Sequence, residues 1–222
     1  MLFRNALAFA FLAISVGQAV AQQATARFPA PSSFHGAQAT IELCKVLLQA
    51  TPISFALSED DGNIAITAHM RSQSQAESLR SLLVGVPFLT SSAKSDVQPG
   101  NEGSSDITFN GQVNTATVEV GVPETAPPRS ELLPLFLVNQ IAVESGVMFE
   151  RFVPDEPVYI GPYWLRITQF SVSGTCEQFT TLLDRLRPHS DSVVPTSNKL
   201  AFDAKLKRPL RWSAELHLRS LD

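Results

Sequence analysis

Apolar residues with helix or strand periodicity occur twice in this chain in the same order: helix, strand, strand, helix, strand, strand. The first copy covers residues 37–120 and the second covers residues 130–222. Helical segments place apolar residues three and four positions apart, whereas strands alternate apolar with polar residues. Each segment therefore has one apolar side, which must be buried against another layer. We predict an α+β protein with two tandem αββαββ sandwich domains, each with two helices on one face of its own four-stranded antiparallel sheet.

The second copy has clear boundaries. Its first helix is expected to end at Gly146, and an alternating strand covers residues 164–173. Thr175 and Gln178 fit a capping box, with a hydroxyl at the N-cap and an amide three residues later, so a second helix is expected to begin there. Residues 210–218 alternate apolar and polar side chains, which is typical of a half-buried antiparallel strand. We expect this closing strand to lie at an edge of its sheet.

The first copy follows the same order. Its first helix begins at Ala37 and ends before Pro52, because the residue preceding a proline is driven out of the helical region. Asp61-Gly62 separates two alternating runs and predicts a tight hairpin, in which glycine supplies a positive φ. Ser72 is expected to cap the next helix. The remaining two strands are predicted at residues 86–97 and 106–120.

The second copy resembles a known family in its apolar spacing and glycines. The helix ending in SGV, the extended FERFVP and the helix CEQFTTLLDRLRP are similar to the periplasmic ferredoxin-like domain of the pilus protein PilO and its type II secretion counterpart GspM. In the first copy, LLQATPISFALSEDDGNIAITAHM and DITFNGQV resemble the corresponding domains of PilN and GspL. The resemblance implies two tandem ferredoxin-like domains.

The resemblance also implies a function. Members of these families are non-catalytic scaffolds that form homodimers and heterodimers within the assembly platform of a type II secretion or type IV pilus system. The chain lacks the transmembrane helix and the coiled coil that normally precede such domains. We therefore expect a soluble adaptor or a fused homologue, whose membrane association would come through its protein partners.

Three segments lie outside the two copies. Residues 1–21 combine Arg4, a short apolar run and an A-x-A site, as a secretory signal peptide does, so we expect a periplasmic protein. An uncleaved anchor helix is the alternative, but the apolar run is shorter than the ~20 residues that span a bilayer. Residues 22–36 are rich in proline, serine and alanine and predict a flexible lead-in. Residues 121–129 contain three prolines and predict a semi-rigid interdomain linker.

Charge and motifs disfavour several functions. The formal net charge of −4 and the absence of a basic cluster disfavour a nucleic-acid partner. No motif of a nucleophilic enzyme or phosphate-binding loop is present, so we predict no catalytic residue, no cofactor and no enzyme activity. The turn at Glu59, Asp60 and Asp61 lacks the ligand spacing of a calcium loop. The histidines lack zinc-ligand spacing, which predicts no metal site, and His217 is expected to be a solvated residue.

Cys44 and Cys176 are the only cysteines. In an oxidising compartment an even number of cysteines favours a disulfide. Both cysteines, however, fall on apolar helix stripes in different predicted domains, and a free cysteine is a common buried apolar residue. A bridge would require the two helices to be in contact. Two interpretations therefore remain, a disulfide between the domains or two buried thiols in separate cores.

A Pro/Gly-rich segment with three aromatic residues is the candidate interface. Tyr159, Tyr163 and Trp164 could form a protein contact site, because such rings bury large area at low entropic cost. Equally, Trp164 could pack into the core with the tyrosines covering it. Glu215, in the closing strand, is the edge position expected to contact a partner. The alternative function is a periplasmic small-ligand binding or sensory module with a cleft between the domains, and a third is an enzyme without a recognisable motif.

Overall fold

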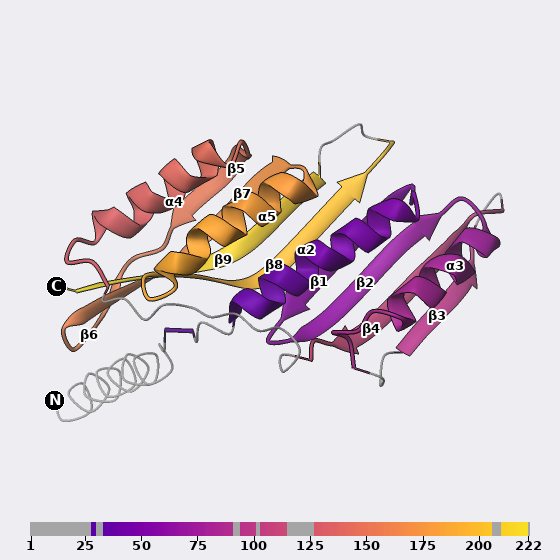
Figure 1. Ribbon diagram of the computed structural model, residues 1–222, viewed down its shortest axis with the longest axis horizontal. Coiled ribbons are helices and arrows are strands. Elements are labelled where there is room, and N and C mark those ends of the chain that lie inside the picture. Colours follow the sequence, from indigo (N-terminus) through magenta and orange to yellow (C-terminus); the bar gives the residue numbers. More distant parts are fainter. Residues whose placement is uncertain are drawn as a thin grey trace, which may run out of the picture.

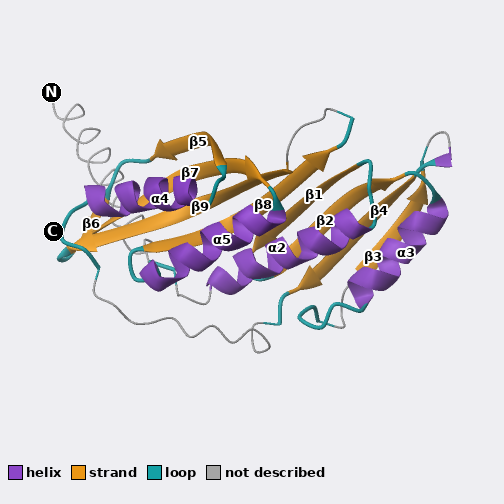
Figure 2. Cartoon of the chain, turned by 45° about the horizontal axis from the view of Figure 1, so that its top comes forward, coloured by secondary structure: helices purple, strands orange, loops and turns teal. Residues whose placement is uncertain are grey.

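The computed structural model describes residues 28–29, 33–90, 94–100, 103–114, 127–205 and 210–221. In these residues, four α-helices cover one face of a mixed α+β structure built on a nine-stranded antiparallel sheet (Figures 1 and 2). The α+β class predicted from the periodicity is therefore confirmed. Within the described residues, no helix combines the length and apolarity that crossing a membrane requires.

The elements of the first half follow the predicted order. They are α2 (Ser33–Gln49), β1 (Ser54–Asp60), β2 (Asn63–Met70), α3 (Gln73–Val84), β3 (Lys94–Pro99) and β4 (Ser105–Gln112). Asp61 and Gly62 have φ of 47° and 80° and form the predicted turn between β1 and β2. The hydroxyl of Ser72 accepts a hydrogen bond from the backbone N–H of Gln75 and caps α3. The strand predicted at residues 86–97 is wrong in its bounds, because α3 is followed by a turn and an isolated bridge at Leu89.

The second half repeats this order with one short additional strand. Its elements are α4 (Leu132–Glu144), β5 (Met148–Pro154), β6 (Val158–Ile160), β7 (Tyr163–Gly174), α5 (Cys176–Leu186), the 3-10 helix η3 (Arg187–His189), β8 (Val193–Asp203) and β9 (Leu210–Leu221). Thr175 and Gln178 form the predicted capping box at the start of α5. Gly146, with φ of 72°, follows α4, and its carbonyl accepts a hydrogen bond of 2.7 Å from Gln178 Nε2. The cap of α5 therefore also holds the end of α4.

The two halves share a single sheet, so the prediction of two separate sheets is wrong. The strand order is β3-β4-β2-β1-β8-β9-β7-β5, with β6 also paired to β7. The two halves join where β1 pairs with β8, with Leu57 opposite Leu200 and Glu59 opposite Asn198. Each half alone would leave an unpaired strand edge at this place, and the pairing removes both edges. Periodicity is local along the chain, so it does not reveal which strands of the two copies meet.

Helix α2 lies over this junction and belongs to both halves. It contacts β1 on one side and β8 and α5 on the other. Its buried side chains, including Phe34, Ile41 and Leu47, belong to one continuous cluster with buried residues of the second half. Under α4 and α5, rings of this cluster and of partly buried residues packed against it are in edge-to-face or tilted contact at centroid distances of 5.8 to 6.4 Å: Phe149, Phe152, Phe170, Phe179 and Trp212. The hydrophobic core therefore crosses the boundary between the copies.

Several predicted segments fall partly or wholly outside the described residues. The predicted signal peptide, 1–21, lies wholly outside them, as do residues 115–120 of a predicted strand and 121–126 of the predicted linker. The predicted lead-in, 22–36, overlaps the first turn of α2, because the helix begins at Ser33 rather than Ala37. At the other end of the linker, the carbonyl of Pro128 accepts a 2.7 Å hydrogen bond from the backbone N–H of Leu221.

The closing strand β9 lies inside the sheet, so its predicted edge position is wrong. Glu215 is opposite Gln169 of β7 on one side and Thr196 of β8 on the other. Alternation along β9 is as predicted, with Trp212, Leu216 and Leu218 buried. The pattern identified the strand correctly, but a half-buried strand has the same pattern at an edge and in the interior of a sheet.

Replacing Glu215 by proline is expected to destabilise the whole chain, because β9 is paired on both sides and proline has no N–H to donate. The expected loss in free energy of unfolding is about 1–3 kcal/mol or more, the cost of an unsatisfied buried backbone group. Glu215→Ala is the control, since alanine keeps the backbone donor. Urea denaturation followed by circular dichroism measures both, and equal midpoints for the two variants would contradict the interior position of β9.

Candidate functional site

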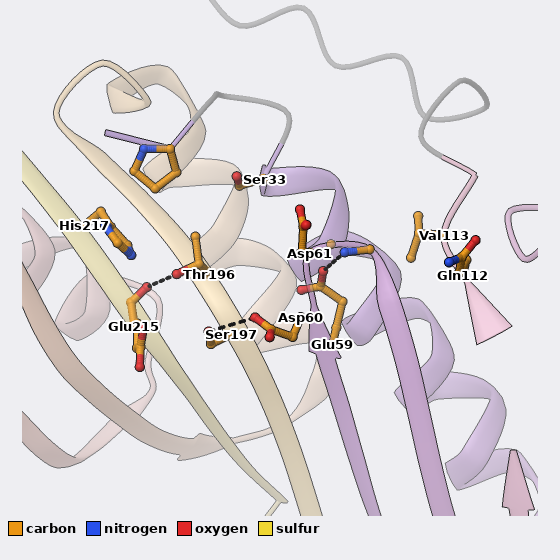
Figure 3. Close-up of a pocket in the computed structure, with 13 residues that line it drawn as sticks. Ser33, Glu59, Asp60, Asp61, Gln112, Val113, Thr196, Ser197, Glu215 and His217 are labelled. Atoms are coloured by element: carbon orange, nitrogen blue, oxygen red, sulfur yellow. Dashed lines mark hydrogen bonds between the residues drawn. The ribbon is translucent and has the colours of Figure 1, made fainter. Parts of the chain in front are cut away.

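An open pocket of about 720 Å³ lies where the β1–β2 turn, β8, β9 and the start of α2 meet (Figure 3). Its polar lining comes from segments far apart in the sequence: Ser33, Glu59, Asp60, Asp61, Gln112, Thr196, Ser197, Glu215 and His217. The acidic turn that the sequence marked as a hairpin is thus brought beside Glu215 and His217. Among the described residues, no group of three His, Cys, Asp or Glu side chains is arranged to hold a metal ion.

Glu59 is the buried carboxyl group of this pocket, only 5% exposed. One oxygen accepts a 2.9 Å hydrogen bond from the backbone N–H of Gly62, and the other accepts a 2.8 Å bond from Asn198 Nδ2. The amide oxygen of Asn198 in turn accepts a bond of 3.2 Å from Trp212 Nε1. Three strands, β1, β8 and β9, are therefore connected by a chain of side-chain hydrogen bonds at the junction of the two halves.

Burial raises the pKa of Glu59 above its ordinary value of 4.5, although its hydrogen bonds with Asn198 and Gly62 act in the opposite direction. The first turn of α2 approaches the carboxyl group so closely that a Cβ at Gly36 would lie 2.4 Å from it. The glycine therefore permits this contact between α2 and β1. No local pattern in the sequence marks Gly36 or Asn198, because a buried amide lies opposite a buried carboxyl group only when β1 and β8 are paired.

The remaining polar groups of the pocket bond mainly to one another. Ser197 Oγ donates a 3.1 Å hydrogen bond to Asp60 Oδ1, and Thr196 Oγ1 donates one of 3.4 Å to the backbone carbonyl of Glu215. Ser197 has φ of 49° and lies in the irregular stretch of β8 where its register against β9 shifts. His217 is half-buried rather than solvated, and this burial lowers its pKa. The arrangement holds the junction together and has the size to accept a small polar ligand.

The two cysteines lie side by side, so, of the two interpretations left open by the sequence, the placement in separate cores is wrong. Cys44 of α2 and Cys176 at the start of α5 have their Sγ atoms 2.9 Å apart, and both residues are buried. They are free thiols in this structure. Lys45, Glu177, Phe202 and Leu210 line an open pocket of about 560 Å³ that reaches Cys176.

The predicted aromatic interface divides into buried and exposed members. Trp164 is 2% exposed and belongs to the core, with the guanidinium of Arg166 5.5 Å from its ring. Tyr163 is half-buried, and the guanidinium of Arg219 lies between its ring and that of Phe28, at 5.5 and 4.5 Å. Tyr159 on β6 is 57% exposed. Of the four candidate interface residues, only Tyr159 therefore lies on an open surface at the sheet edge.

Tyr159 is one of several exposed apolar side chains on three neighbouring elements, which together we call the α4–β5–β6 edge. It is formed by exposed side chains of these three elements: Leu132, Leu133, Phe136, Val143, Met148, Val153, Val158 and Tyr159. Phe136 is 70% exposed. Helix α4 is apolar nearly all round, so the spacing of its residues does not reveal which side is buried. The structure buries Pro134, Val138, Ile141 and Ala142 and leaves Leu133 and Phe136 exposed.

Comparison of the chain with protein-family models, with curated proteins and with solved structures finds no match.

The raised pKa of Glu59 predicts a pH-dependent stability. A carboxyl group that binds its proton more tightly in the folded state stabilises that state at pH values below its pKa in the unfolded chain. This stabilisation is lost as the pH rises through its pKa in the folded protein. Glu59→Gln cannot ionise, so the free energy of unfolding of the parent minus that of Glu59→Gln should fall as the pH rises from about 4.5. Urea denaturation between pH 4 and 8 measures this difference. Asp61→Asn removes the same charge at an exposed position and serves as control. A difference between the parent and Glu59→Gln that rises with pH would refute the raised pKa of Glu59.

Proposed function

We propose that the protein is a non-catalytic scaffold that acts through protein–protein contacts at the edges of its sheet. The observation that carries this proposal is the position of the exposed apolar side chains. Among the described residues, eleven large hydrophobic side chains are exposed, and nine of them lie between Leu132 and Ile167. Their concentration at one end of the molecule is typical of an interaction site, whereas isolated exposed apolar residues are common on any protein.

The partner that fits this edge is a second copy of the chain. Within one molecule, β1 and α2 of the first half pack against β8 and α5 of the second half. Leaving out the short β6, β1 and α2 are the first strand and first helix of their half, and β8 and α5 are the third strand and second helix of theirs. In the second half, β5 and α4 take the places of β1 and α2. In the first half, β3 and α3 take the places of β8 and α5. Strand β3 lies at the opposite end of the sheet, where a partner could pair with it.

Two further features support a head-to-tail contact, in which the α4–β5–β6 edge of one copy meets the β3 and α3 end of the next. The other two exposed large hydrophobic side chains, Leu82 and Val84, lie on α3. Every pair of neighbouring strands is antiparallel, so β3 of a second copy would continue the alternation beyond β5 with its helices on the same face. Pro99 and the polar residues of β3 are typical of a protected edge, so we expect the helices to contribute most of a reversible contact. Because the two ends differ, such contacts extend into rings or filaments.

The resemblance to the PilN, PilO, GspL and GspM domains extends the proposal to a cellular setting. We infer that the two halves are ferredoxin-like units joined edge to edge, and the repeated order of helices and strands supports this interpretation. The proposed scaffold would then work in the periplasm, as an adaptor of a type II secretion or type IV pilus-like assembly.

A small-ligand binding or sensory module is the second candidate. It is favoured by the pocket of about 720 Å³ at the junction, whose polar lining comes from both halves. A ligand bound there would contact β1, β8 and β9 together and would raise the melting temperature with its concentration. Screening small polar compounds by thermal melting tests this candidate.

Charged substitutions at the two ends should separate the head-to-tail contact from other modes of association. Phe136→Glu blocks the α4–β5–β6 edge and Leu82→Glu blocks the α3 end, because each places a charge where an apolar contact is expected. In sedimentation velocity with the full chain, each variant alone should stay monomeric, whereas their equimolar mixture should form a dimer. The parent chain should form larger, concentration-dependent species.

Thr181→Glu on the exposed face of α5 adds the same charge and should associate like the parent chain. All three variants should have free energies of unfolding within about 0.5 kcal/mol of the parent, as expected for exposed positions. Association of Leu82→Glu alone would indicate a two-fold contact through α4 instead. A parent chain that remains monomeric at every concentration would refute the second copy as partner.

A further inference from the structure

The two cysteines are in contact where α2 of the first half packs against α5 of the second half. Their sulfur atoms are 2.9 Å apart, which is longer than a disulfide bond of about 2.05 Å by less than 1 Å. The two residues are 132 positions apart in the sequence, so their proximity depends entirely on the packing across the β1–β8 junction. A second contact between the same two regions, from Arg187 Nη2 to Gln38 Oε1 at 2.9 Å, holds α2 in this position.

The two sulfur atoms differ in access and in chemical character. Cys176 lines an open pocket, whereas Cys44 has no exposed surface. Cys176 is also the first residue of α5, directly after its N-cap, where the helix dipole favours a thiolate. The hydrogen bond between the sulfur atoms lowers the pKa of Cys176 and raises that of Cys44, whose burial raises it further. Access and electrostatics therefore both favour Cys176 over Cys44 as the thiol that reacts first.

We propose that Cys44 and Cys176 are a site of oxidative modification, at which a disulfide-bearing oxidant converts them into a disulfide that links the two halves of the sheet. The thiolate of Cys176 attacks one sulfur of the oxidant's disulfide and displaces its first thiolate, giving a mixed disulfide. Cys44 then loses its proton and attacks Cys176 Sγ, which displaces the second thiolate. The protein gives up two electrons and two protons, and the oxidant's disulfide is reduced to two thiols.

The consequence is a covalent link at the junction of the two halves. A bridge across so long a segment restricts the unfolded chain strongly and therefore stabilises the folded protein. For a chain of this size we expect the melting temperature of the oxidised protein to exceed that of the reduced protein by roughly 5–15 °C. The proposal stands independently of the scaffold function, because neither cysteine belongs to the α4–β5–β6 edge.

The test uses the reduced full chain exposed to oxidised glutathione, followed by denaturation without reductant and thiol labelling. The parent chain should lose both reactive thiols, lose the mass of two hydrogen atoms and melt at a higher temperature. Two free thiols after this treatment would overturn the proposal. So would a bridge that forms only when the protein is oxidised in denaturant, because the native contact would then not be its source.

Single variants test the order of reaction. Cys44→Ala should accumulate one glutathione adduct at Cys176, because the resolving thiol is missing. Cys176→Ala should remain unmodified while folded, because Cys44 is covered by the core. Equal rates of adduct formation in the two variants would contradict the assignment of Cys176 as the nucleophile. The double variant serves as control, and its melting temperature should be the same with and without oxidant.

Discussion

The pairing of β1 with β8 is the interaction on which the rest of this structure depends. It merges two sets of strands into one sheet, and it provides the surface that α2 covers. At one end of this pairing a buried carboxyl group, a buried amide and an indole form a hydrogen-bonded chain through Glu59, Asn198 and Trp212. Each of these groups is costly to bury without its partner, so the chain favours one register of the two strands over its neighbours.

Joining two similar units edge to edge leaves two unlike ends. The face of α2 that meets β8 and α5 has its counterpart on α4, where Phe136 and its apolar neighbours are exposed. Two units joined in this way cover one edge of each other, but the other edge of each unit stays uncovered, and these two edges differ. Only a closed ring of such units would leave no edge uncovered. In the head-to-tail association that we propose, the exposed apolar side chains of α4 in one copy would meet those of α3 in the next.

The polar groups at the junction serve its architecture. Ser197, Asp60 and Thr196 bond within the pocket, and Gly36 allows α2 to lie against Glu59. The same junction brings Cys44 and Cys176 together, so the strength of the contact between the halves depends on hydrogen bonding and on the oxidation state of the two sulfur atoms.

The sequence by itself determined the elements, because their causes are local. The turn at Asp61-Gly62, the capping box at Thr175 and the alternation along β9 each depend on residues within a few positions. Tertiary structure alone decided that β9 lies in the interior of the sheet and that the strands of the two halves form a single sheet instead of two. It also decided that Cys44 meets Cys176, that Trp164 is buried and that Phe136 is exposed. The physical reason is that strand pairing and helix packing join residues far apart in the chain. Periodicity shows that a segment has an apolar side, but which segment covers that side, or whether any does, is set by the shape of the whole molecule.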